Sequence, residues 1–316
     1  MQLTRKDIIT NADTIWKQIR WNGKAPVCTC GCDKIYHLKD GRYKCSKCGV
    51  TFSDTSNTIL HNSKLAKWQW LDAIYMLVTL KHISSRELAN EIGVNKTTAW
   101  LLLNKVRMYM EMDKIDFSGV CMMDEAHIGG WTNMHLNKKM EYMRNNGFIE
   151  RGQKHYDKRT IFQASSDKKA HILGMVNAEG KCQILHIHRQ IDRDIIKQVV
   201  KHYGVARIIS DESQIYRGIN GVDVEQSNHS KNIYITKGGH SSNACENRFS
   251  WVKRIYQLYT HSKPEYMQLY LNQVAYKINQ SKSSREERFY HLLGLCMEGG
   301  YKRLEDYNPN DWLMAA

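Results

Sequence analysis

The sequence predicts an α/β protein in which a layered α/β domain follows a cysteine-rich module and an all-helical region. Five of the nine cysteines lie between residues 28 and 48. Residues 64–112 have the apolar periodicity of helices. From about residue 117, short apolar runs typical of strands alternate with helical segments. We therefore expect three parts, at residues 1–58, 59–115 and 116–316.

The composition indicates a protein that meets a polyanion. The chain has 316 residues, a formal net charge of +14 and a pI near 9.3. Nucleic acid is the leading candidate partner for a basic protein of this kind. The chain has no apolar run of the roughly eighteen residues that a membrane span needs, and its N-terminus has no signal-peptide pattern. We expect a cytoplasmic protein with no membrane partner.

A helix over residues 3–20 precedes a predicted zinc ribbon. Cys45-x-x-Cys48-Gly49 has the spacing of a zinc knuckle, and residues 35–44 read as strand, turn and strand. Zinc takes four tetrahedral ligands, so two of the three upstream cysteines should bind. Cys28 and Cys32 are the preferred pair, and the choice stays open. The candidate zinc ligands are Cys28, Cys30, Cys32, Cys45 and Cys48. A redox CxxC is disfavoured because no βαβ pattern surrounds the cysteines.

Residues 84–110 predict a helix-turn-helix. Ser84 or Ser85 begins a helix, Gly93 turns the chain and Asn95 begins a second helix with a polar, basic start. An ordinary helical hairpin is the alternative. The predicted DNA contacts are Lys96, Thr97 and Thr98 to bases or phosphates, and Lys105 and Arg107 to phosphates.

Strands and helices then alternate. Residues 119–128 and 206–210 are apolar runs that reach Asp124 and Asp211. Residues 131–158 are basic, polar and poorly periodic, which is typical of a loop. Further elements are expected as strands at 160–167, 170–177 and 182–189, and as helices at 192–204, 264–280 and 284–297.

The stretch 239–259 predicts a helix that carries a functional face. Glu246 and Lys253 are seven residues apart, two helical turns, so they project from nearly the same side. Asn243 lies one turn earlier on that side, and Arg254 adjoins Lys253. A solvated surface helix is the plainer interpretation.

Together these residues predict a site for divalent metal. Asp124, Asp211 and Glu246 come from separate elements, and magnesium takes oxygen ligands while keeping positions for phosphate and water. Lys253 would hold a phosphate. The competing acids are Glu125, Glu212 and Asp223. A nuclease based on His127, His229 or His240 is an alternative, although these histidines lack metal-ligand spacing.

The chain resembles bacterial insertion-sequence transposases that join a zinc ribbon, a helix-turn-helix and a DDE-type ribonuclease-H-like core, relatives of the eukaryotic Merlin elements. The resemblance covers nearly the whole chain. It rests on Arg20-Trp21-Asn22-Gly23, Cys45-x-x-Cys48-Gly49, Asp124-Glu125-x-x-Ile128-Gly129-Gly130, Ser210-Asp211-Glu212 with Tyr216, Asn228-His229-Ser230, and Asn243-x-x-Glu246 with Lys253-Arg254.

The resemblance implies a mixed sheet flanked by helices. It also implies Mg²⁺, or Mn²⁺, held by Asp124, Asp211 and a third residue, either Glu246, which we prefer, or Asn243. Double-stranded DNA would be the partner, at element ends and at the target, for a homodimer or larger assembly. The rival hypotheses are a non-catalytic DNA-binding regulator, a metal-dependent nuclease and a decayed transposase that binds without cutting.

Overall fold

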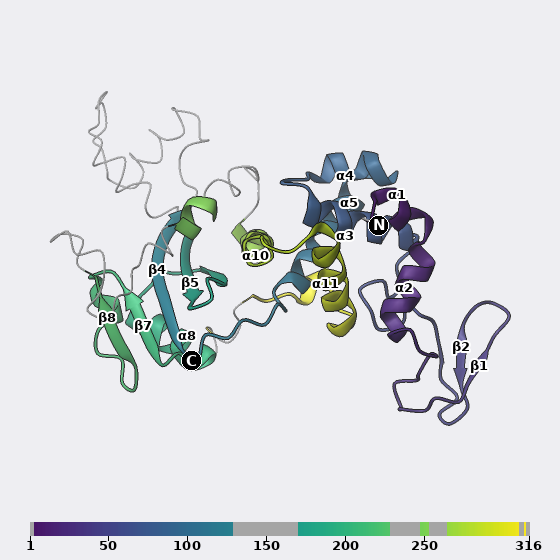
Figure 1. Cartoon of the computed structure of the whole chain (residues 1–316), viewed down its shortest axis with the longest axis horizontal. Coiled ribbons are helices and arrows are strands. Elements are labelled where there is room, and N and C mark those ends of the chain that lie inside the picture. Colours follow the sequence, from purple (N-terminus) through teal and green to yellow (C-terminus); the bar gives the residue numbers. More distant parts are fainter. Residues whose placement is uncertain (1–2, 129–169, 228–246, 253–263, 310–312, 314–316) are drawn as a thin grey trace, which may run out of the picture. The chain divides into compact units, whose positions relative to one another are not determined.

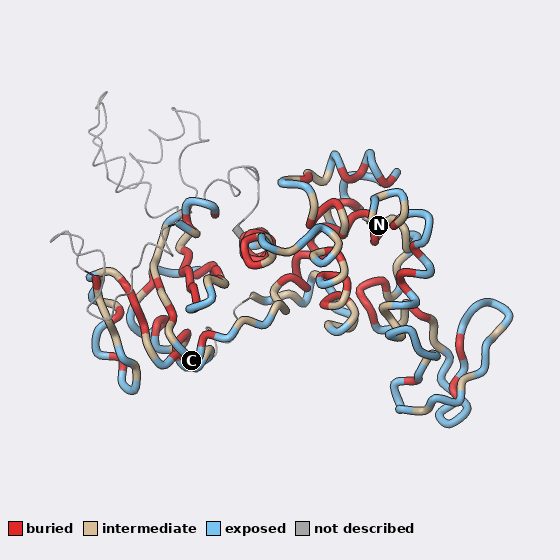
Figure 2. The backbone as a smooth tube through the Cα atoms, in the orientation of Figure 1, coloured by how far each residue is buried: buried red, intermediate tan, exposed pale blue. Residues whose placement is uncertain are grey.

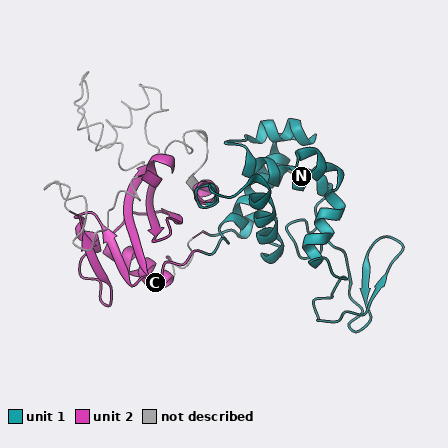
Figure 3. Ribbon diagram, viewed as in Figure 1, with its two compact units in different colours: residues 1–114, 276–308 teal, residues 115–275, 309–316 magenta. Residues whose placement is uncertain are grey.

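The structure, a computed structural model, describes residues 3–128, 170–227, 247–252, 264–309 and 313. The chain forms two compact units (Figure 3). Unit 1 comprises residues 1–114 and 276–308, and unit 2 comprises residues 115–275 and 309–316. The sequence predicted that the C-terminal helices belong to the third part of the chain, residues 116–316. Instead the last helix belongs to unit 1.

Unit 1 is a helical cluster joined to a small sheet (Figure 1). Asn11 separates two helices where the sequence predicted one, because its backbone (φ −104°, ψ 18°) departs from helical geometry. The elements are α1 (Arg5–Thr10), α2 (Ala12–Trp21), β1 (Ile35–His37), β2 (Tyr43–Cys45), β3 (Thr51–Phe52), α3 (Lys67–Thr79), α4 (Ser85–Ile92), α5 (Lys96–Met110), α11 (Arg285–Glu298) and the 3₁₀ turn η6 (Leu304–Asp306).

Helix α3 is the centre of unit 1, and α1, α2, α4, α5 and α11 all pack against it. Asp72 on α3 is fully buried, and Arg5 pairs with both of its carboxylate oxygens at 2.7 and 2.8 Å. The returning chain satisfies carbonyls at the end of α3: the Lys277 ammonium donates to Leu80 O at 2.8 Å. Cations suit this end of a helix because the helix dipole is negative there.

Unit 2 is a five-stranded mixed sheet with the order β6-β5-β4-β7-β8. Strand β4 pairs antiparallel with β5 and parallel with β7, and β7 pairs parallel with β8. Helix α10 continues from unit 2 into unit 1. The elements are β4 (Val120–Ile128), β5 (Ala170–Asn177), β6 (Cys182–Ile187), α8 (Arg193–Tyr203), β7 (Arg207–Ser210), β8 (Asp223–Gln226), α10 (Met267–Asn279), and the 3₁₀ turns η2 (Gln214–Tyr216) and η5 (Pro264–Tyr266).

Helices flank the sheet, and β5 and β6 are buried along most of their length, while most of β4 is half-buried (Figure 2). One face packs on α8: Met123, Leu173 and Leu185 share a core with Ile196 and Val199. On the other face the helical residues 247–252 place Phe249 against Gly174. The edge strand β6 is covered by Gln268 of α10. Its side chain accepts from His186 N–H at 2.7 Å and donates to Ile184 O at 2.8 Å, as a neighbouring strand would.

Several local predictions are confirmed. Ser84 and Asn95 accept hydrogen bonds from the third residue of their helices, and Gly93 and Gly204 end helices with left-handed backbones at φ 68° and 65°. Strand β8 was not predicted, because a four-residue edge strand with polar residues has no apolar alternation. The strand expected at residues 160–167 lies outside the described residues.

Replacing Gly174 with alanine should destabilise unit 2. A Cβ at this position would lie 2.7 Å from Phe249 Cζ, and Phe249 is buried. We expect a loss of about 1–3 kcal/mol, measured as a lower thermal unfolding temperature, and partial recovery in Gly174→Ala/Phe249→Leu. Gly294→Ala is the control, since its Cβ would meet no atom within 4 Å. Equal effects of the two single changes would contradict the packing argument.

Candidate active site and metal centre

Asp124 and Asp211 lie at the same level of β4 and β7, just past the paired part of the two parallel strands. Strand β4 aligns with β7 through Cys121 with Ile208 and Met122 with Ile209. Asp124 is two residues beyond Met122, and Asp211 is two residues beyond Ile209, so both acids lie the same distance past the last paired residues. Both side chains are half-buried. Two carboxylates at one level of adjacent strands are oxygen donors of the kind that divalent cations prefer.

The loop that carries Asp211 is held from β8. Asp211 Oδ1 accepts the Ser213 backbone N–H at 3.0 Å. Gln226, the last residue of β8, donates from Nε2 to Asp211 O at 2.7 Å and to Ser213 O at 2.8 Å. Arg217 Nε in turn donates to Gln226 Oε1 at 2.8 Å. The strand that the sequence did not reveal therefore fixes the path of the chain at Asp211.

Glu125 points to the opposite face of the sheet from Asp124, because consecutive strand residues alternate. Its Oε2 accepts the hydroxyl of buried Tyr216 at 2.5 Å. Burial raises the pKa of Glu125 most, with the Tyr216 hydrogen bond opposing the shift and the Asp211 charge adding to it. Burial also raises the pKa of Tyr216, and the charges of Glu125, Asp124 and Asp211 raise it further. Glu125 thus serves as the partner of Tyr216.

The other competing acids differ in position. Asp223 pairs with Arg207 at 2.8 Å, and these residues face each other at the opposite end of β7 from Asp211. Glu212 follows Asp211 directly and is exposed. Of the acids in the described residues, Asp124 and Asp211 therefore remain the pair that the parallel strands bring together.

The face of the sheet that holds Asp124 also receives the helix of residues 247–252. Asp124 pairs across β4 and β5 with Gly174, so the two residues share a face. Phe249 lies against Gly174 on that face. Several predicted site residues lie outside the described residues: Asn243, Glu246, Lys253, Arg254, His229 and His240.

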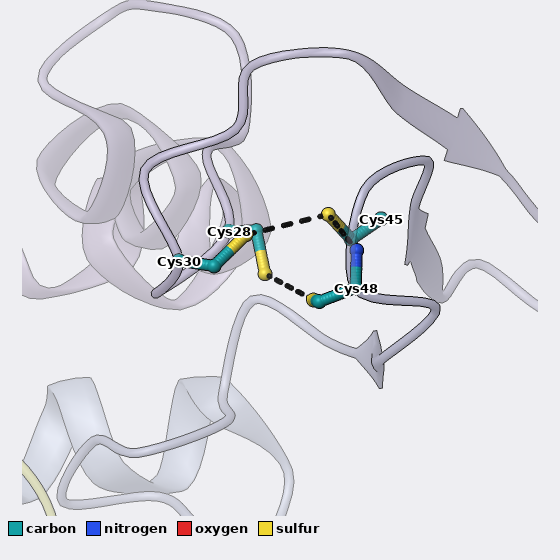
Figure 4. A group of neighbouring side chains, drawn as sticks. All are labelled: Cys28, Cys30, Cys45 and Cys48. Carbon is teal, nitrogen blue, oxygen red and sulfur yellow. Dashed lines mark hydrogen bonds between the residues drawn. The ribbon is translucent and has the colours of Figure 1, made fainter.

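Four cysteines of the ribbon form a cluster in which the four sulfur atoms lie within 4.8 Å of one another (Figure 4). They are Cys28, Cys30, Cys45 and Cys48. The Sγ atoms of Cys28 and Cys48 are 3.5 Å apart, and those of Cys30 and Cys45 are 3.6 Å apart. Tetrahedral zinc with Zn–S bonds of about 2.3 Å would separate its sulfurs by about 3.8 Å, so the cluster fits zinc.

The structure gathers Cys30 in place of Cys32, which the sequence had favoured. The turn at Gly31 is left-handed (φ 79°), and Cys28 N–H bonds to Cys32 O at 3.0 Å. Cys32 Sγ lies 3.6 Å from Ser46 Oγ instead of joining the cluster. The backbone N–H groups of Cys48 and Lys47 point at Cys45 Sγ and lower its pKa, which favours the thiolate that binds a metal.

Zinc content should distinguish the two upstream cysteines. Cys30→Ser removes one of the four clustered sulfurs, so we expect loss of most bound zinc in elemental analysis of the purified protein. Cys32→Ser is the matched control and should keep one zinc per chain. The reverse result would exclude the cluster in Figure 4 as the metal site.

The predicted DNA contacts of the helical region divide into two groups. At the start of α5, Lys96 and Thr97 are exposed and Thr98 is half-buried. The prediction that Arg107 contacts a DNA phosphate is wrong. Arg107 is 2% exposed, and its Nη1 donates to buried Asn104 at 2.8 Å. Arg107 lies one turn after buried Leu103, so it faces the interior of unit 1.

Lys105 is half-buried, and its ammonium lies 5.5 Å from the centroid of the Tyr301 ring. Burial lowers its pKa. The interaction with Tyr301 and the partial burial make Lys105 a weaker phosphate contact than Lys96.

Substitutions of Lys96 and Arg107 should affect different properties, DNA binding for Lys96 and stability for Arg107. Lys96→Gln should leave the unfolding temperature unchanged and reduce the salt dependence of DNA affinity by about one phosphate contact, read from the slope of log K against log salt. Arg107→Gln should lower the unfolding temperature, since buried polar partners lose a hydrogen bond. A stable Arg107→Gln protein with a reduced slope would reverse the assignment.

Comparison with known proteins gives the family. Residues 116–279, slightly more than half of the chain, match a family model described as the ISXO2-like transposase domain. The chain therefore belongs to the ISXO2-like transposase family, and the predicted resemblance to insertion-sequence transposases is confirmed.

One curated relative is an uncharacterized protein in transposable element ISH50 of Halobacterium salinarum. It is 24% identical to this chain over 157 residues, which are 48% of this chain and 52% of the relative. The chain thus matches about half the length of this relative. Within the described ranges, no helix is both long and apolar enough to cross a membrane.

Proposed function

We propose that this chain is a DNA transposase that binds the terminal inverted repeats of an insertion sequence, then cuts and joins DNA at a divalent-metal site. The observation that supports the proposal is the parallel register of β4 and β7, by which Asp124 and Asp211 each follow two residues after the last paired residues, Met122 and Ile209. Both acids lie inside the region that matches the transposase family. Unit 2 would be the catalytic core, and unit 1 the DNA-binding part.

A ribonuclease-H-like core is supported by the arrangement of the sheet. Three antiparallel strands, β6, β5 and β4, are followed by parallel β7 and β8, with α8 on one face and residues 247–252 on the other. In this arrangement Asp124 lies on the central strand β4, and Asp211 directly follows the neighbouring strand β7.

Asp124, Asp211 and Glu246 would hold Mg²⁺ or Mn²⁺, with Asn243 as the alternative third ligand. Oxygen donors suit these ions. The described helical residues 247–252 follow Glu246 in the chain, and Phe249 among them lies against Gly174, the cross-strand partner of Asp124. Bound divalent ions would supply polarisation of the phosphate and activation of the attacking oxygen.

The protein side chains would contribute position and charge. Gln226 holds the loop that carries Asp211, and Tyr216 donates a hydrogen bond to Glu125, which strand alternation directs to the opposite face from Asp124. We assign Lys253 and Arg254 to the phosphate backbone, because cations beside the reacting phosphate offset its charge.

The reaction would take place in two steps. Water would first hydrolyse a phosphodiester at each element end, which frees a 3′-hydroxyl. That hydroxyl would then attack a target phosphodiester, so that one P–O bond forms as another breaks. Two ends must meet, so we propose a homodimer or larger assembly.

The test is cleavage of a labelled duplex that carries the inverted repeat flanking the gene, in magnesium. Asp211→Asn and Asp124→Asn should each lower the nicking rate more than about 100-fold, because even outer-shell partners of a metal contribute about 10- to 100-fold. Glu246→Gln and Asn243→Ala, compared side by side, identify the third ligand by the larger loss.

Glu212→Gln is the matched control, a carboxylate one residue from Asp211 that is exposed. It should nick the repeat as fast as the unchanged protein. Repeat-specific binding with no nicking in magnesium or manganese would favour a regulator or a decayed transposase. Equal cleavage of duplexes that lack the repeat would favour a nuclease.

A further inference from the structure

The sheet of the zinc ribbon has two chemically different faces. Its register pairs Tyr36 with Lys44 and Lys44 with Thr51, so these three residues lie on one face. The alternate residues Ile35, Cys45, Tyr43 and Phe52 lie on the other face. We call the face with Tyr36, Lys44 and Thr51 the outer face, and the face with the alternate residues the inner face.

The inner face is packed. Trp21 of α2 contacts Tyr43 and Phe52 edge-on, with ring centroids 6.0 and 6.3 Å apart. His37 adds an edge contact to Tyr43 at 5.2 Å. Such aromatic pairs stabilise the sheet against α2 and bury Tyr43 at the middle of the inner face.

The outer face is exposed, aromatic and basic. Tyr36 on the edge strand β1 is 52% exposed, and its cross-strand partner Lys44 on the central strand β2 is also exposed. Continuing the alternation adds exposed Lys34 from the start of β1 and exposed Arg42 from the start of β2. Arg42 is paired with Asp40 at 2.6 Å, which leaves Lys34 and Lys44 as its strongest positive charges.

The ribbon is fixed at its base. Trp16 Nε1 donates to Asp54 O at 3.1 Å and Arg20 Nη2 donates to Ser56 O at 3.0 Å, just after β3. Lys67 of α3 pairs with Asp54 at 2.7 Å. The segment after β3 is therefore already ordered against the helices of unit 1. Binding of a ligand to the outer face needs no further loss of conformational entropy in this segment.

We propose that the outer face of the ribbon is a second DNA-binding surface, in which Lys34 and Lys44 neutralise phosphates of a duplex and the Tyr36 hydroxyl donates to a phosphate oxygen. This inference rests on the proposed function, and it adds a contact separate from the start of α5. Lysine and tyrosine are ordinary phosphate ligands in protein–DNA complexes. Lysine is depleted from protein–protein interfaces, which argues against a protein on this face.

The surface would read the backbone and not the bases. Arg42 is the guanidinium fork of this face and is already paired with Asp40, which leaves two lysine ammonium groups, and these suit phosphate oxygens. The ribbon would therefore strengthen binding to any duplex, and the start of α5 would supply the sequence preference.

The test measures affinity against salt concentration for the full-length protein, by fluorescence anisotropy on two duplexes, one with the inverted repeat and one unrelated. Lys34→Gln/Lys44→Gln should reduce the slope of log K against log salt by about 1.8 on both duplexes, since each phosphate contact contributes about 0.9. Tyr36→Ala should weaken binding about 10-fold, and Tyr36→Phe nearly as much, because the hydroxyl makes the contact.

Lys6→Gln/Lys17→Gln is the matched control, with the same loss of charge at exposed positions of α1 and α2. It should keep the slope. Zinc content and unfolding temperature of every variant should equal those of the unchanged protein, so that a reduced slope reports contact and not unfolding.

An unchanged slope in Lys34→Gln/Lys44→Gln would overturn this inference, as would an equal fall in the control. An unchanged slope with an altered molecular mass in solution would identify the face as an interface between copies of the chain. Failure of the unchanged protein to bind either duplex would refute the proposed function itself. Intact slopes with no nicking would refute only the catalytic part.

Discussion

The parallel pairing of β4 with β7 is the constraint on which the candidate active site depends. Asp124 and Asp211 are 87 positions apart in the chain, and only the register of these two strands brings them to the same level. A one-residue slip would turn one acid to the other face, because side chains alternate along a strand. The core on the α8 side opposes such a slip. A shifted β4 would remove Met123 from this core, and a shifted β7 would remove Ile208.

Alternation along β4 also gives two adjacent acids different surroundings. Asp124 shares a face with Gly174, where the absence of a side chain lets Phe249 approach. Glu125 faces Tyr216 in the opposite layer, where burial raises its pKa and a hydrogen bond stabilises its charge. Strand β4 thereby contributes the Asp124 carboxylate to the candidate metal site and the Glu125 carboxylate to the structure that supports Asp211.

Unit 1 combines three parts of the chain around α3. The N-terminal helices are tied by the ion pair of Arg5 with buried Asp72, and the C-terminal segment by Lys277. The family match ends at residue 279, before α11, yet α11 packs on α3. The same unit presents Lys96 and Thr97 at the start of α5 and Tyr36 and Lys44 on the ribbon. Unit 1 thus exposes positive charge both at the start of a helix and on the outer face of a sheet.

The sequence by itself determined the features that depend on neighbouring residues. Helix starts at Ser84 and Asn95 and the left-handed turn at Gly93 follow from interactions within four residues, and the apolar runs before Asp124 and Asp211 are local as well. Only the tertiary structure decided which long side chains are buried and which loop atoms meet. Arg107 looked like a surface cation, but the bundle encloses it. Cys30 joins the cysteine cluster where Cys32 was expected. The left-handed turn at Gly31, and not the sequence spacing, decides which sulfur points into the cluster. Strand β8 has too little apolar pattern to be read from sequence, and it forms because β7 offers it an edge.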